Sequence, residues 1–220
     1  MRKILIFRNA LIVLVVVIAI CYAFFMRTKN TQNSKTNELF YQLINKKLVT
    51  MNIGFEEKEK KGNIIFSTDK DNNKAIQIVE IFDDSEQAKE DNTSHIKNIS
   101  IIENEKTHTY QINYDLNTYM DFGENDNDSD ITNWIENLNR VITNSKYYVK
   151  GYEKINKTKL YSETFKESGY VFYYDGNELR YIKQKDGFSG NENTLYSIKV
   201  EDAFVENSLL EIPNNFTLNN

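Results

Sequence analysis

The chain has 220 residues, of which 40% are hydrophobic and 27% are charged, with 32 acidic side chains against 27 basic ones. This composition supplies enough apolar residues for a folded core, which excludes a disordered chain. Residues 1–29 hold five basic and no acidic side chains, so the remainder carries 22 basic against 32 acidic groups. This charge of −10 argues against nucleic acid as a ligand, because polyanions are bound by basic surfaces.

The first predicted element is a membrane anchor. Residues 10–26 read ALIVLVVVIAICYAFFM and contain no charged side chain. A helix of this length reaches about 25 Å at ~1.5 Å per residue, near the lower limit for a membrane span. Basic side chains precede the run, so we expect a signal anchor over residues 1–27, contact with the membrane through residues 4–26, a cytoplasmic N-terminus and an extracytoplasmic remainder.

Two processing alternatives remain open at this end. Ile18-Ala19-Ile20-Cys21 resembles the bacterial lipobox, in which the cysteine is lipidated after cleavage. Ile20 departs from that pattern, which requires a small residue there. A secretory signal peptide would also need a small-residue cleavage site, and none follows. We therefore expect a retained helix, with Cys21 as the candidate lipidation site if processing occurs.

The remainder is predicted to be a polar tether over residues 28–36 and a single β-rich domain over 37–220. An amphipathic helix is expected over about 36–49 from its helical apolar spacing. Two β-branched segments, 63–68 and 75–82, flank the turn-forming sequence DKDNN and predict a hairpin.

The central region shows a strand pattern followed by a helix pattern. Apolar residues alternate with mostly polar ones from Tyr110 to Phe122, which predicts a curved antiparallel sheet with one buried face. A helix over about 130–143 has Trp134 in the middle of its apolar stripe and is expected to cover that face. The candidate ligand or core face consists of Tyr110, Ile112, Tyr114, Leu116, Ile131, Trp134, Ile135 and Leu138.

Five short strands joined by tight turns are predicted after this helix, over 147–155, 158–166, 169–174, 177–183 and 195–204. Exposed tyrosine clusters, such as Tyr147-Tyr148 and Tyr173-Tyr174, are candidates for contacts with a partner.

Three segments carry a resemblance to a known family: Lys150–Glu153 with Lys159–Tyr161, Phe172–Leu179, and the ending Leu210–Phe216. They resemble the strand pairs and terminal motif of LolA/LppX-like proteins, the lipoprotein-carrier superfamily, in clostridial-type Gram-positive bacteria. The resemblance implies an α+β fold in which a curved antiparallel half-barrel is covered by amphipathic helices. It also implies a concave face that holds acyl chains or supports another protein, and some members are similar to a germination lipoprotein that binds a spore-cortex amidase.

No catalytic, cofactor or metal site is predicted. Asp126, Asp128 and Asp130 imitate the start of a calcium loop, but the required Gly and Glu are replaced by Ile131 and Asn137. We expect a non-enzymatic, membrane-tethered module that binds an envelope protein. A carrier of lipid or acyl chains is the alternative, and a cell-wall hydrolase using acidic residues is a remote one.

Overall fold

The computed structural model describes residues 28–30, 34–104, 106–125, 142, 144–145, 147–184 and 194–219. Most of these residues form β-strands that hydrogen-bond into a single sheet. The first run of strands comprises β2 (Leu48–Glu57), β3 (Lys60–Asp69), β4 (Lys74–Asp83), β5 (His95–Glu103), β6 (Lys106–Asn113) and β7 (Thr118–Asn125). The second run comprises β8 (Tyr147–Ile155), β9 (Thr158–Phe165), β10 (Tyr170–Asp175), β11 (Glu178–Gln184) and β12 (Thr194–Glu201).

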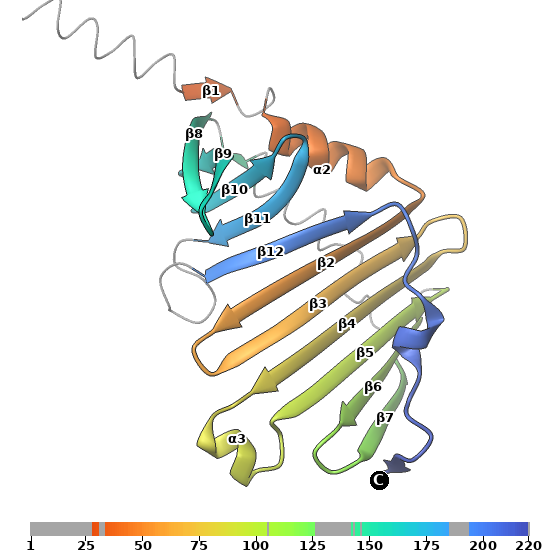
Figure 1. The fold of residues 1–220 in the computed structure, drawn as a ribbon. Helices are drawn as coiled ribbons and strands as arrows, with labels where there is room; N and C mark the ends of the chain where they lie inside the picture. The colour runs from red at the N-terminus through yellow and green to blue at the C-terminus, as the bar shows by residue number, and fades with distance from the viewer. Residues whose placement is uncertain are drawn as a thin grey trace, which may run out of the picture.

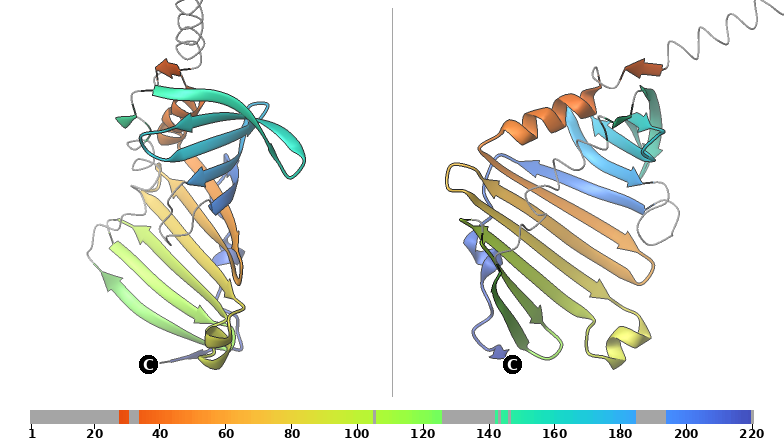
Figure 2. Two further views of the ribbon diagram at one scale, coloured as in Figure 1. Left: turned by 90° about the vertical axis from the view of Figure 1, so that its left-hand side faces the viewer. Right: turned by 180° about the vertical axis from the view of Figure 1, so that it is seen from behind.

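Two short strands, β1 (Thr28–Asn30) and β13 (Thr217–Leu218), complete a 13-stranded sheet at its two edges. The strand order is β1-β8-β9-β10-β11-β12-β2-β3-β4-β5-β6-β7-β13, and every described pair is antiparallel except β7 with β13. The last strand of the second run, β12, therefore pairs with the first strand of the first run, β2. Figure 1 shows this single sheet, and Figure 2 shows that it twists from one end to the other.

Asparagine shapes several of the tight turns. Asn73, Asn104, Asn117 and Asn156 each adopt a positive φ, between 48° and 53°. Asparagine tolerates this left-handed conformation better than most residues, because its short side chain can hydrogen-bond locally. The many asparagines of the chain thus permit short connections, which place successive strands side by side.

The longer described helix is α2 (Lys35–Asn45), and it lies against one face of the sheet (Figure 1). Its N-cap is Ser34, whose hydroxyl accepts a hydrogen bond from the Asn37 N–H at 2.9 Å. Phe40 and Leu43 on its apolar side are buried. They join the first core, which includes Met51, Phe66, Ile142, Tyr148, Phe165, Phe172 and Ile198.

A second core occupies the opposite face of the first run of strands. Phe66 belongs to the first core while its neighbour Ile65 belongs to the second, because successive strand residues point to opposite faces. The second core includes Ile65, Ile76, Ile78, Ile99 and Ile112. Its cover is the C-terminal segment, defined here as Ala203–Asn219, which contributes Phe204, Val205, Leu210, Ile212 and Phe216 and contains the 3₁₀ helix η2 (Asn207–Leu210).

The predicted α+β half-barrel covered by amphipathic helices is wrong. The described residues are predominantly strand, and their helical part consists of α2, the five-residue α3 (Glu86–Glu90), η2 and isolated residues at 142 and 144. The second core is covered by the C-terminal segment, in which Leu210 lies in the short η2 while Ile212 and Phe216 lie outside any helix. The predicted hairpin at residues 63–82 is confirmed by β3 and β4.

The prediction of an N-terminal transmembrane helix is also not supported and is withdrawn, together with the single-pass membrane location and the signal anchor. Among the described parts of the chain, no helix combines the length and the apolar character needed to cross a bilayer. The prediction depended on the hydropathy of residues 10–26 and on the charges that flank them, and those residues, with Cys21, lie outside the described part of the chain.

Candidate binding site

The β8–β9 hairpin displays a cluster of lysines and tyrosines on one face. Its register pairs Tyr152 with Tyr161 and Lys154 with Lys159, and directly paired residues of an antiparallel ladder share a face. Lys150 joins them because alternate strand residues point to the same side. We call these five residues, Lys150, Tyr152, Lys154, Lys159 and Tyr161, the lysine–tyrosine face.

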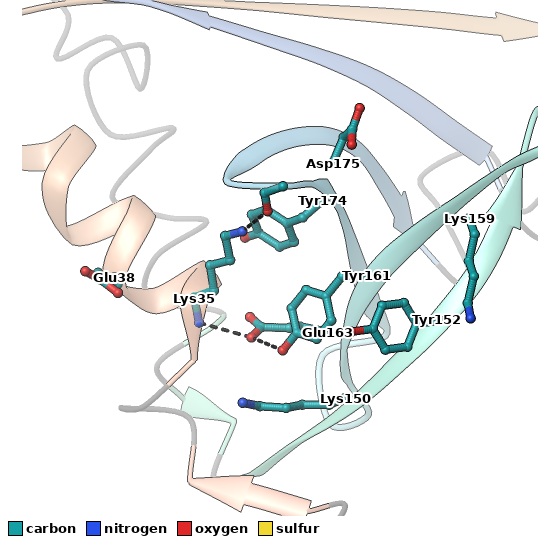
Figure 3. A pocket seen from close by; sticks show the side chains of 10 residues that line it. Lys35, Glu38, Lys150, Tyr152, Lys159, Tyr161, Glu163, Tyr174 and Asp175 are labelled. Atoms are coloured by element: carbon teal, nitrogen blue, oxygen red, sulfur yellow. Dashed lines mark hydrogen bonds between the residues drawn. The ribbon is translucent and has the colours of Figure 1, made fainter.

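An open pocket of about 540 Å³ lies between part of this face and the start of α2. Figure 3 shows Tyr152 and Tyr161 beside each other, with Lys150 below them and Lys35 of α2 on the opposite side. The rings of Tyr152 and Tyr161 meet edge to face with centroids 5.7 Å apart. The Lys159 ammonium lies 5.1 Å from the centre of the Tyr152 ring. The Tyr152 side chain is 66% exposed, so a large aromatic surface faces solvent here.

The lysines of this face form no described ion pair, although Lys150 lies directly opposite the buried Glu163 in the β8–β9 ladder. No described carboxylate lies within ion-pair distance of Lys150, Lys154 or Lys159. Lys154 and Lys159 are also directly opposite each other, and like charges in that position destabilise a sheet. Three carboxylates line the pocket: Glu38 and Asp175 lie at the rim of the labelled cluster in Figure 3, and Glu163 lies in its middle, where its oxygens are occupied by hydrogen bonds. The face is therefore locally basic in an acidic chain.

A buried carboxylate fixes the geometry beside this face. Glu163 is fully buried, and each of its two oxygens accepts two hydrogen bonds. Oε1 accepts from the Lys35 backbone N–H at 3.0 Å and from the Tyr161 hydroxyl at 2.8 Å. Oε2 accepts from the Thr36 N–H at 2.8 Å and from the Thr36 hydroxyl at 2.6 Å. The carboxylate thus satisfies two free N–H groups of the first turn of α2, where the helix dipole also favours negative charge.

We call Glu163 with its four hydrogen bonds the Glu163 anchor. Two further contacts hold the start of α2 in the same place. The Tyr174 hydroxyl donates to Thr36 Oγ1 at 2.8 Å. The Lys35 ammonium donates to the Gly176 carbonyl and lies 4.6 Å from the centre of the Tyr174 ring. Burial lowers the pKa of the Lys35 ammonium, while the Glu163 carboxylate opposes that shift. Burial, and then the hydrogen bond to Glu163, raise the pKa of Tyr161, so its hydroxyl remains a donor near neutral pH.

The two described histidines each have a single carboxylate partner. His95 Nε2 lies 2.8 Å from Glu80 Oε1, and its ring stacks between Phe82 and Tyr114. His108 Nε2 lies 2.7 Å from an Asp121 oxygen. Within the described ranges, no group of three or more His, Cys, Asp or Glu side chains could hold a metal ion.

The predicted ligand or core face is divided by the structure. Ile112 is fully buried, Tyr110 and Tyr114 are partly buried, and all three belong to the second core beneath the C-terminal segment. Leu116 lies in the turn after β6 and is 48% exposed. The other four predicted residues, Ile131, Trp134, Ile135 and Leu138, lie outside the described residues.

Three of the four tyrosines predicted to contact a partner are core residues. Tyr148, Tyr173 and Tyr174 are at most 1% exposed, whereas Tyr147 is 55% exposed. Tyr152, which is not one of the four predicted contact tyrosines, is more exposed than any of them. Its signal was the Lys-x-Tyr-x-Lys alternation of residues 150–154, which puts three side chains on one side of a strand.

No family model matches the chain, and no curated protein matches it. A weak structural likeness exists to the crystal structure of an uncharacterized conserved protein from Thermus thermophilus. The identity is 9%, the match covers 84% of this chain and 96% of that chain, and the TM-score is 0.39. A likeness of this size carries no argument about function.

Proposed function

We propose that this protein is a non-enzymatic binding module that binds an acidic segment of a partner protein through the lysine–tyrosine face. One observation carries the proposal. Three exposed lysines that form no described ion pair lie on the same face as the Tyr152–Tyr161 pair, in a chain whose net charge is −5, and the one carboxylate opposite them, Glu163, is buried and fully hydrogen-bonded. An acidic ligand would remove the repulsion between Lys154 and Lys159 and supply the missing counter-charges.

The tyrosines favour a protein ligand. Tyrosine provides a large, rigid contact area with a polar tip and loses little conformational freedom on binding, so it is enriched at protein interfaces. The Glu163 anchor holds α2 next to the face, which keeps the pocket formed before any ligand arrives. The small basic area suits a short acidic segment better than a long polyanion, because the acidic remainder of the chain would repel the latter.

The other candidate functions lack support at this site. A hydrolase needs a carboxylate free to act as acid, base or nucleophile, whereas both oxygens of Glu163 are occupied by the start of α2 and by Tyr161. An acyl-chain carrier needs an apolar cavity, and the pocket here is lined mainly by charged side chains and tyrosines. The resemblance to LolA/LppX-like proteins and the carrier alternative that it implies stay predictions.

The test is direct binding of a glutamate-rich synthetic peptide, followed by fluorescence anisotropy. Replacing the three lysines of the face with glutamine should weaken the dissociation constant by about tenfold or more, since each contributes a charge contact. The control replaces three exposed lysines elsewhere, Lys47, Lys89 and Lys199, and alters net charge equally. Equal loss in both variants would show non-specific attraction and would overturn the proposal.

A second arm tests the class of partner. The same assay is run with an oligothymidylate and with a uronic-acid polysaccharide at equal charge concentration. The peptide should bind more tightly than either polymer, and its affinity should fall as salt rises. Tighter binding of the oligonucleotide or the polysaccharide would overturn the assignment of a protein partner.

A further inference from the structure

The strand that carries the lysine–tyrosine face also has an open edge. On the side away from β9, β1 pairs with Tyr147, Tyr148 and Val149 only. No described strand lies beside Lys150–Ile155 on that side (Figures 1 and 2). Alternate residues of this stretch therefore direct backbone N–H and C=O groups away from the sheet. We call Lys150–Ile155 on this side the open edge.

We propose that the acidic segment of the partner binds as an added β-strand on the open edge. This inference deepens the proposed function and rests on it. β1 shows that the same edge already accepts a strand, in antiparallel register with Thr28 opposite Val149. Backbone hydrogen bonds would provide affinity, and the side chains of the lysine–tyrosine face would select the sequence.

The register of β8 defines the sequence that the edge selects. An added strand places every second side chain on the lysine–tyrosine face, opposite Lys150, Tyr152 and Lys154 in turn. The matching segment has an acidic residue, an apolar residue and an acidic residue at alternate positions. This pattern reads identically in both chain directions, so it holds for a parallel or an antiparallel partner.

The other face of β8 sets a second condition, on the two residues of the added strand that lie between the three already assigned. They lie beside Gly151 and Glu153, and Glu153 accepts a hydrogen bond from the Tyr173 hydroxyl at 2.8 Å. An acidic side chain at these positions would meet the Glu153 carboxylate, so neutral residues are favoured there. The selected segment is therefore acidic–neutral–apolar–neutral–acidic.

Charge also argues against a second copy of this chain as the occupant. An antiparallel pairing of two open edges centred on Tyr152 would place Lys150 opposite Lys154 of the other copy, twice over. Inward or edge-placed lysines are a common protection of sheet edges against such pairing. The open edge therefore discriminates between a basic strand and an acidic one.

The experiment uses the full chain and two labelled peptides of identical composition. One has the central sequence Glu-Thr-Val-Thr-Glu, and the other has Thr-Glu-Val-Glu-Thr, each flanked by neutral residues. The first should bind about tenfold more tightly, because only its acidic residues match the spacing of Lys150 and Lys154. Equal affinity of the two peptides would overturn the register.

Backbone methylation separates strand addition from simple ion pairing. The tighter peptide is N-methylated on its odd residues in one version and on its even residues in another. Strand addition predicts that one version loses about tenfold in affinity or more while the other keeps it, because only alternate N–H groups face β8. No loss in either version would overturn strand addition and leave the proposed function standing.

Hydrogen exchange provides the readout on the protein. Binding of the tighter peptide should slow exchange of alternate amides within Lys150–Ile155, with little change at the β7 edge. If replacing Lys150, Lys154 and Lys159 with glutamine leaves peptide binding unchanged, the proposed function itself fails. If those substitutions abolish binding while exchange at the open edge is unaffected by the peptide, only strand addition fails.

Discussion

Replacing Glu163 with glutamine should destabilise the protein by about 3 kcal/mol, because an amide cannot reproduce the hydrogen bonds of the carboxylate. Each carboxylate oxygen accepts from one backbone N–H and one hydroxyl. Glutamine keeps one acceptor oxygen and presents an NH₂ group in place of the other. The hydroxyls of Thr36 and Tyr161 can rotate and accept from that group, but the N–H of Lys35 or of Thr36 cannot.

The magnitude follows from that one orphaned N–H. A hydrogen bond to a charged group contributes ~1.5–3 kcal/mol, and leaving a buried donor unsatisfied costs ~1–3 kcal/mol. The lost favourable interaction of the carboxylate with the helix N-terminus adds up to ~1 kcal/mol. These contributions overlap, so about 3 kcal/mol is expected, a large share of the ~5–15 kcal/mol that stabilises a typical domain.

Urea denaturation followed by circular dichroism measures this cost. The matched control is Glu90→Gln at an exposed site, which should change the free energy of unfolding by less than ~0.5 kcal/mol. Tyr161→Phe removes one of the four donors and should cost about 1 kcal/mol. A Glu163→Gln variant as stable as its control would refute the assignment of Glu163 as the anchor of α2.

Three further predictions concern other parts of the sheet. Phe172→Ala empties the centre of the first core and should cost ~3–5 kcal/mol, measured by urea denaturation; a cost below ~1 kcal/mol would show that this side chain is not core. The hydrogen bond from Lys60 lowers the pKa of Asp83 to about 2, so this carboxylate stabilises the fold above its unfolded pKa of ~3.9 and loses that effect as pH falls toward 2. Asp83→Asn should therefore lower the melting temperature near neutral pH and make no difference below about pH 2, and a pH-independent difference would contradict the linkage. Phe216→Ala removes a ring that packs on the second core and should speed amide exchange at Asn219, which donates to the sheet edge, while exchange in β3 stays unchanged.

The strands were largely predictable because their signals are local. Strands 147–155, 158–166 and 177–183 agree with β8, β9 and β11 to within a residue at each end. β-branched and aromatic residues alternate within each, and turn residues separate them. The first predicted helix, over 36–49, starts within one residue of α2 but ends four residues beyond it.

The one-sided face from Tyr110 to Phe122 failed because of one turn. The even-numbered residues were expected to share a face, but the chain turns between Asn113 and Thr118, and these two residues pair. An odd number of steps across the turn reverses the alternation, so Ile112 lies opposite Tyr119 instead of Met120. Periodicity measured across an unrecognised turn therefore assigns the second strand to the wrong face.

The covers of the first and second cores depended on contacts that leave no local pattern. Ile142, at the end of the predicted covering helix, lies in the first core with Phe40, whereas Ile112 lies in the second. The Glu163 anchor joins residues 127 positions apart in the chain. The sequence around Glu163 indicates neither its hydrogen-bond partners nor its burial. A single acidic residue between Ser162 and Thr164 is typical of a strand position that faces solvent.

The pairing of β2 with β12 has a consequence for how the chain folds. β2 is made early, but its neighbour on one side lies 143 residues later at the Gly54–Ser197 pair. Long-range pairings of this kind form slowly, because the entropy of closing the loop is lost before the contacts form. During synthesis the first run of strands can assemble by local hairpins. The edge of β2 that later pairs with β12 stays unpaired until nearly the whole protein has left the ribosome. The half-made protein is therefore most prone to aggregate at β2, and a chaperone that shields extended apolar strands should act on this interval.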